Sequence, residues 1–286
     1  MDIGVCLPIG VPGAAGSQLI EFARRADRLG FSSLTVTDRV VYDSYDSIVA
    51  LSAAAAVTTR IKLVTAVLLP AYRPSTVELA KQLASLDRLS EGRLVIGVSA
   101  GMREDDYAAT GTGFGTRGRR LDTMLEELRE VWAGKGPVPG VGPQPVNGDI
   151  PVWGGGHSPA GLRRAARHAI GWISPGGPPQ RFADQVAGFR ALWDEEGRTG
   201  TPRMGANCYV ALGPDGKEHA REHMLSYYAY MGKMAEHLAA GAVTEADTLR
   251  ALVDGYAAAG CDELFLLPVT ADPGHLDLLA DAVLRR

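Results

Sequence analysis

Ile150–Ser174, IPVWGGGHSPAGLRRAARHAIGWIS, joins a short apolar run, three glycines and a basic helical segment. Ser158 is a preferred residue for the position before a helix, and Pro159 suits the first helical position. The start of a helix offers free N–H groups at the positive end of its dipole, so this turn can hold an anion such as phosphate. The alternative is a glycine-rich strand-to-helix turn that binds nothing.

The composition is that of an ordinary globular protein able to bury a core. The chain has 286 residues, of which 46% are hydrophobic and 22% charged, and its formal net charge is −4. Lys and Arg are dispersed apart from short clusters at 117–120 and 163–167, so no broad basic surface for nucleic acid is expected. No apolar run reaches the length of a membrane helix and the chain opens on a strand pattern, which predicts a cytoplasmic protein without membrane attachment.

Two motifs that suggest metal or dinucleotide binding lack the context that these functions need. His219 and His223 are four residues apart, but no glutamate follows the first histidine, so a solvated helix face is favoured. The run at 113–118 matches G-x-G-x-x-G but follows a helical stretch and no strand. Three distant cysteines, Cys6, Cys208 and Cys261, lie in strand-like runs and are expected to be buried thiols. We predict no metal site.

Apolar β-rich runs alternate with helical stretches along the whole chain. Strands are expected at 3–7, 33–37, 61–68, 93–98, 150–153, 170–174, 204–212 and 262–268. Because parallel strands need crossover connections, this order predicts a (β/α)8 TIM barrel with short insertions, with an open doubly wound sheet as the alternative. The Pro/Gly-rich connector at 134–148 is interpreted as a long loop, so residues 1–286 are expected to form a single domain.

In such a barrel the chemistry lies where strands end. Asp38 and Arg39 follow the second expected strand, and they are either site residues or a salt-bridged loop pair. Ser99 ends the fourth strand in a run of small residues that leaves room for a flat ligand. Arg117 precedes the next helix and is a candidate phosphate ligand, the alternative being a solvated basic turn. Tyr42, Tyr45, Tyr72 and Tyr107 lie on the exit loops and are candidates for an aromatic wall.

Several of these segments together resemble a known family. The pattern comprises Thr37-Asp38, LVTAVLLP at 63–70, LASLDRLSEGRLVIGVSAGMREDDYAATG at 83–111, RGRRLDTMLEELREVW at 117–132 and VWGGGHSPAGLRRAARHAIGWI at 152–173. It is similar to the bacterial luciferase-like superfamily of flavin- or deazaflavin-dependent oxidoreductases, which fold as (β/α)8 barrels. The resemblance covers nearly the whole chain.

The resemblance implies positions for a cofactor. Its ring is expected against a bulge in the third strand, at a cis peptide bond between Ala66 and Val67, with Ser99 beside the reactive edge. The phosphate is expected at the cradle formed by Gly155, Gly156, His157 and Ser158, with Arg117 or Arg119 as a helper. Asp38, Arg39 and Ser99 are the candidate catalytic residues.

Two reactions fit this resemblance. In the first, FMN reduced by a separate flavin reductase is used with oxygen as a monooxygenase on a small organic substrate. The alternative is hydride transfer with the deazaflavin coenzyme F420, as a reductase or dehydrogenase. A non-catalytic flavin-binding protein is a further hypothesis. The family's usual contact surfaces match the second and third helices of this chain, which predicts a homodimer.

The chain departs from the family at two places. Many members have a histidine after the acid that ends the second strand, where this chain has Arg39, so no histidine acid or base can be assigned there. The region after the seventh strand, at 213–217, leaves little room for the insertion that some members fold over the substrate. A more open pocket is therefore expected.

Overall fold

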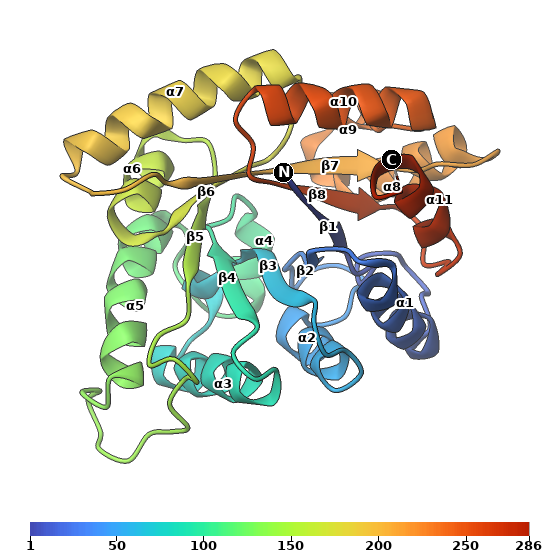
Figure 1. Ribbon diagram of the computed structural model, residues 1–286. Coiled ribbons are helices and arrows are strands. Elements are labelled where there is room, and N and C mark those ends of the chain that lie inside the picture. The colour runs from blue at the N-terminus through green and yellow to red at the C-terminus, as the bar shows by residue number, and fades with distance from the viewer. Residues whose placement is uncertain (286) are drawn as a thin grey trace.

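The computed structural model describes residues 1–285, whose strands close into a parallel barrel in chain order. Figure 1 shows the helices packed around the outside of these strands. The strands are β1 (Asp2–Cys6), β2 (Ser33–Val36), β3 (Lys62–Leu68), β4 (Leu94–Val98), β5 (Val152–Gly155), β6 (Gly171–Ser174), β7 (Arg203–Val210) and β8 (Glu263–Pro268). The predicted (β/α)8 TIM barrel is confirmed.

Pairing of the first and last strands excludes the open sheet. β1 lies parallel to β8, with Asp2 opposite Glu263 and Val5 opposite Leu266. In an open sheet, strands at the two ends would each leave a row of backbone N–H and C=O groups unpaired. Closure removes both edges and brings the carboxyl ends of the strands into one ring.

The helices cover the barrel with apolar faces. The main ones are α1 (Gly16–Leu29), α2 (Ser47–Ala55), α3 (Thr76–Leu89), α4 (Glu104–Ala109), α5 (Arg117–Trp132), α6 (Pro159–His168), α7 (Pro179–Glu195), α8 (Gly216–Tyr227), α9 (Lys233–Ala240), α10 (Ala246–Ala258) and α11 (His275–Val283). In α1 the buried residues are Leu19, Phe22, Ala23 and Ala26, at helical spacing, and Gly30 ends the helix at φ 98°. This spacing is typical of an amphipathic helix, and a glycine with positive φ is a common C-cap. No helix among residues 1–285 is both long and apolar enough to cross a bilayer.

Short helices interrupt the segments that connect the strands near the barrel mouth. η1 (Pro70–Tyr72) follows β3, η2 (Phe114–Thr116) precedes α5, and η3 (Ala229–Met231) lies between α8 and α9. From the short region at 213–217 onward, the helices α8, η3 and α9 lie between β7 and α10. These additional helices supply part of the cavity wall described below.

The core has an inner and an outer layer. The inner cluster consists of buried side chains from five of the strands, namely Cys6, Ala66, Trp153, Ile173, Phe265 and Leu267. The outer and larger cluster packs the helices onto the strands. The cysteines are buried and free, and burial raises the pKa of the Cys6 thiol to about 11. They are therefore protonated packing residues, as predicted.

Close packing of α6 on β5 requires a glycine at position 154. A Cβ atom at Gly154 would lie 2.2 Å from the Ala165 Cβ and 2.7 Å from its Cα. We expect Gly154→Ala to lower the free energy of unfolding by about 1–3 kcal/mol, as overpacked core positions do, measured by urea denaturation.

Gly188 provides the matched control. It lies inside α7, and a Cβ there would meet nothing within 4 Å. Gly188→Ala should therefore raise stability by about 0.5–1 kcal/mol, because alanine is the better helix former. Equal effects of the two substitutions would contradict the packing role of Gly154.

Candidate functional site

A cavity of about 830 Å³ opens at the carboxyl ends of the strands. Its size is typical of a site for a cofactor or a drug-sized ligand. The candidate catalytic and cofactor-binding residues proposed from the sequence all line it: Asp38, Arg39, Ala66, Val67, Ser99, Arg117, Gly155, Gly156, His157 and Ser158. The fold thus brings together residues that are far apart in the chain.

The turn between β5 and α6 is preformed for an anion. Ser158 caps α6, because its Oγ accepts a hydrogen bond from the Gly161 amide at 3.1 Å. The Gly156 carbonyl accepts a hydrogen bond from Trp172 Nε1 at 2.7 Å, which fixes the turn. Ala160, in the first turn, lines the cavity, and its amide lies among the groups that a helix leaves without an internal partner. This end of the cavity therefore offers backbone donors and a positive dipole end.

The three glycines after Trp153 have different structural roles. Gly154 and Gly155 end β5, and a Cβ at Gly155 would lie 2.8 Å from Val67 Cγ1. Both are therefore needed for packing within the protein. Gly156 alone has a positive φ, 98°, which an L side chain rarely adopts.

Arginines surround the cradle. Arg117 donates from Nε to the Gly101 carbonyl at 3.2 Å and from Nη1 to the Phe114 carbonyl at 3.0 Å. Arg119 also lines the cavity and is exposed. Arg164, on α6, is held by Asp122 at 2.5 Å. Sequence reasoning missed Arg164, although it lies in the basic stretch after the glycines.

The floor of the cavity is an irregular part of β3. The pairing of β3 with β4 shifts register between Thr65 and Leu68, and the Ala66–Val67 peptide bond is cis, as the resemblance implied. Ser99, at the end of β4, lies near the cradle, since a Cβ at Gly156 would be 3.5 Å from its Oγ. The bulge, Ser99 and the phosphate cradle therefore form one continuous surface.

Asp38 is buried and its carboxylate is engaged by protein groups. Its oxygens accept hydrogen bonds from Ser47 Oγ at 2.9 Å, from the Leu69 amide at 2.8 Å and from Arg73 at 2.7 and 3.2 Å. Burial raises the pKa of Asp38, but the charge of Arg73 and these hydrogen bonds outweigh burial and hold the pKa below 3.8. A carboxylate so paired positions the loop after β3, and its geometry does not support the catalytic role inferred from the sequence.

Arg39 packs against two aromatic rings. Its guanidinium carbon is 4.4 Å from the ring centre of Tyr42 and 4.5 Å from that of Tyr227. Its Nη1 donates to the Tyr227 carbonyl at 2.6 Å, and its Nη2 donates to the Val41 carbonyl at 3.2 Å. A guanidinium has five donors and no acceptor, so Arg39 places a positive charge in the cavity. Its catalytic role stays a prediction.

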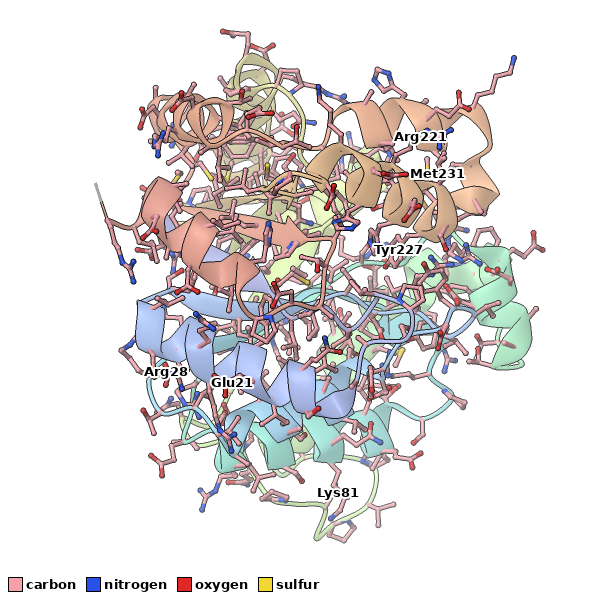
Figure 2. All side chains as sticks on the ribbon, turned by 90° about the vertical axis from the view of Figure 1, so that its right-hand side faces the viewer. Glu21, Arg28, Lys81, Arg221, Tyr227 and Met231 are labelled. Atoms are coloured by element: carbon pink, nitrogen blue, oxygen red, sulfur yellow. The ribbon has the colours of Figure 1, made fainter. Side chains whose placement is uncertain are left out.

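Tyrosines from β7 and from the segment after it form one wall, which the sequence reasoning missed. Tyr209, Tyr227, Tyr228 and Tyr230 line the cavity, and the hydroxyls of Tyr209 and Tyr228 are 2.9 Å apart. Figure 2 shows Tyr227 between the helices that follow β7 and the loops of the N-terminal strands. The signal in the sequence is the run SYYAYM at 226–231, a cluster of aromatics in a polar helical stretch.

The tyrosines that were predicted to form the wall lie elsewhere. Tyr72 and Tyr107 are buried beside one another behind the cavity surface, and the Tyr45 hydroxyl donates to the Ala14 carbonyl. Tyr42 contacts Tyr227 edge-on but does not line the cavity. Among residues 1–285, no group of three or more His, Cys, Asp or Glu side chains is placed to hold a metal ion.

The fold is a closed (β/α)8 barrel. Its main cavity contains both the bulge of β3 and the start of α6, as expected for a ligand-binding protein of this fold. The model of the luciferase-like monooxygenase family matches residues 1–264, and the chain belongs to that family. Membership supports an oxidoreductase activity.

Relatives and solved structures agree with this family. An uncharacterized protein of Mycobacterium tuberculosis is 32% identical over 212 residues, which cover 63% of this chain and 73% of that protein. An F420-dependent glucose-6-phosphate dehydrogenase of Kribbella flavida is 32% identical over 127 residues, which cover 41% of this chain and 38% of that protein. The structure of the monooxygenase RslO1 from Streptomyces bottropensis matches with a TM-score of 0.81 and 23% identity, covering 100% of this chain and 99% of that one. An F420-dependent secondary alcohol dehydrogenase matches with a TM-score of 0.82 and 17% identity, covering 99% and 98%. These structural likenesses show a common fold.

Proposed function

We propose that this protein is an oxidoreductase that binds a flavin-type cofactor between the bulge of β3 and the cradle at the start of α6. The observation that carries the proposal is the single cavity that contains both features. A flat ring would lie against Ala66 and Val67, beside Ser99. Its phosphate would lie at Gly156 and Ser158, where the amide groups and the helix dipole favour an anion.

Other groups in the cavity fit such a ligand. Asn207 lines the cavity from β7, and its Oδ1 is buried without a hydrogen-bond partner among residues 1–285. Buried acceptors are normally paired, so a bound molecule with an N–H group would complete this one. Arg117 is half-buried beside the cradle and lines the cavity, so its charge adds to the attraction for a phosphate.

The first candidate reaction is oxygenation of a small organic substrate by a monooxygenase that uses reduced FMN. The cofactor would supply the redox chemistry, and the protein would supply binding, orientation and electrostatics. The description of the family supports this candidate. A separate flavin reductase would provide the reduced cofactor.

A second candidate, hydride transfer with coenzyme F420, is favoured by the exposure of the cradle. His157, Ser158 and Ala160 are exposed, and Arg119 lies at the same side of the cavity. A cofactor with a tail beyond its phosphate would therefore meet solvent and a positive charge, with no wall in the way. The name of the Kribbella flavida relative supports the same candidate.

A titration separates these candidates. We expect the purified protein to perturb the visible spectrum of one cofactor, FMN or F420, and to bind the other at least about 10-fold more weakly. Incorporation of isotopically labelled oxygen into a product would then identify the oxygenase, and oxygen-independent turnover with F420 the hydride-transfer enzyme. Binding without turnover would favour a flavin-binding protein, and failure to bind either cofactor would remove the proposed function.

A further inference from the structure

The arginines that line the cavity form two separate groups. Arg117, Arg119 and Arg164 surround the cradle after β5, whereas Arg39 follows β2. Two strands, β3 and β4, lie between these positions in the ring of the barrel. A cofactor phosphate at the cradle would therefore lie away from Arg39 and from Arg103, which contacts the same Val41 carbonyl as Arg39 and pairs with Asp105 and Asp106.

The other cavity arginines are engaged by carboxylates or lie at the cradle. Arg164 pairs with Asp122 at 2.5 Å, and Arg103 pairs with Asp105. Within residues 1–285, none of the ion pairs includes Arg39. A charge that is partly removed from water is costly unless a counter-charge is present, so this position is suited to an anion supplied from outside.

The hydrogen bonds of Arg39 leave donors available. A guanidinium has five N–H groups, of which one on Nη1 and one on Nη2 donate to backbone carbonyls. Nε is buried and has no partner among residues 1–285. The two remaining N–H groups lie on Nη1 and Nη2. The rings of Tyr42 and Tyr227 contact the guanidinium, and together with the two hydrogen bonds to backbone carbonyls they fix its orientation before any ligand arrives.

We propose that Arg39 binds the carboxylate of an organic acid substrate, an inference that rests on the proposed oxidoreductase function. Two available N–H groups on one planar guanidinium match the two oxygens of a carboxylate. A phosphate has more oxygens to satisfy and is better served by the cradle, with its several amides. The carboxylate end of the substrate would lie near β2, and the remainder of the molecule would extend toward Val67 and Ser99, which line the same cavity.

The test uses benzoate and its neutral isostere benzamide as probes, with calorimetric titration of the protein. We expect benzoate to bind at least about 10-fold more tightly than benzamide, because a charge-assisted pair is present only with the acid. Added salt should weaken the binding of benzoate and leave that of benzamide unchanged. Equal affinities in the unmodified protein would overturn the proposal without any substitution.

Substitutions show which residue causes the preference for benzoate. Arg39→Met should remove the preference for benzoate, and Arg39→Lys, which keeps the charge but loses the planar fork, should retain part of it. Arg119→Met is the matched control: it removes an arginine at the cradle, so FMN should bind more weakly while the preference for benzoate persists. Thermal melting would show that each variant is folded. Undiminished preference in a folded Arg39→Met protein would refute the role of Arg39.

The two proposals fail in different ways. If FMN and F420 both fail to bind but benzoate is still preferred through Arg39, the anion site stands and the cofactor function falls. If a cofactor binds and benzoate is not preferred, the function stands and the substrate class is wrong.

Discussion

Ser158→Asp is expected to weaken the binding of FMN by about 100-fold or more. Aspartate is as good a helix N-cap as serine, so α6 should still begin at Pro159. Its carboxylate would place a negative charge where the phosphate is proposed to bind and would itself occupy the positive end of the dipole. Like charges at such short range cost several kcal/mol, which corresponds to this loss of affinity. Fluorescence titration of FMN with the unmodified protein and with the variant would measure this loss of affinity.

Two comparisons separate charge from structure. Ser158→Ala removes the hydrogen bond to the Gly161 amide without adding charge, so it should cost about 1 kcal/mol of stability and affect FMN far less than Ser158→Asp does. Riboflavin has the same ring but no phosphate, and its affinity should be nearly equal in the serine and aspartate proteins. A parallel loss of riboflavin affinity would show that the cradle had been distorted and that charge was not the cause. If F420 is the cofactor that binds, the same control is its deazaflavin without the phosphate.

The fold followed from local patterns. The strand expected at 61–68 is observed as β3, Lys62–Leu68, and the strand expected at 93–98 is observed as β4, Leu94–Val98. Apolar runs and helical faces are properties of neighbouring residues, and the parallel order of the strands leaves few ways of closing the core. The position of the cradle followed for the same reason, because Ser158 and Pro159 mark the start of a helix by themselves.

The parts of the site that were missed depend on contacts between distant segments. The sequence places Arg39 beside an acid, but not against the carbonyl of Tyr227, which is 188 residues away. It shows a glycine at 154, but not that Ala165 packs onto it. Asp38 and Arg39 are neighbours in the chain, yet one is paired with Arg73 and the other packs against tyrosines. These contacts arise from packing between distant segments, and patterns of neighbouring residues do not predict them.

Asp38→Asn is expected to lower the free energy of unfolding by about 3–5 kcal/mol, because it leaves the charge of Arg73 without its partner. The exposed fractions of the two side chains, 2% for Asp38 and 13% for Arg73, place this pair among the buried ones. Asparagine has the same shape, so the loss would reflect charge and hydrogen bonding and would leave no cavity. Urea denaturation of both proteins at neutral pH measures the difference.

The pH dependence tests the same interpretation of Asp38. A carboxylate whose pKa is lower in the folded protein than its ordinary 3.8 stabilises the fold above that ordinary value and loses this contribution as pH falls through the lowered pKa. The difference in free energy of unfolding between the unmodified protein and Asp38→Asn should therefore be constant near neutral pH and shrink in acid. Glu196→Gln, which breaks an exposed pair with Arg167, should change stability far less at any pH. If Asp38→Asn instead left stability unchanged and abolished only turnover, Asp38 would be a catalytic residue after all, and its pairing with Arg73 would be incidental to the fold.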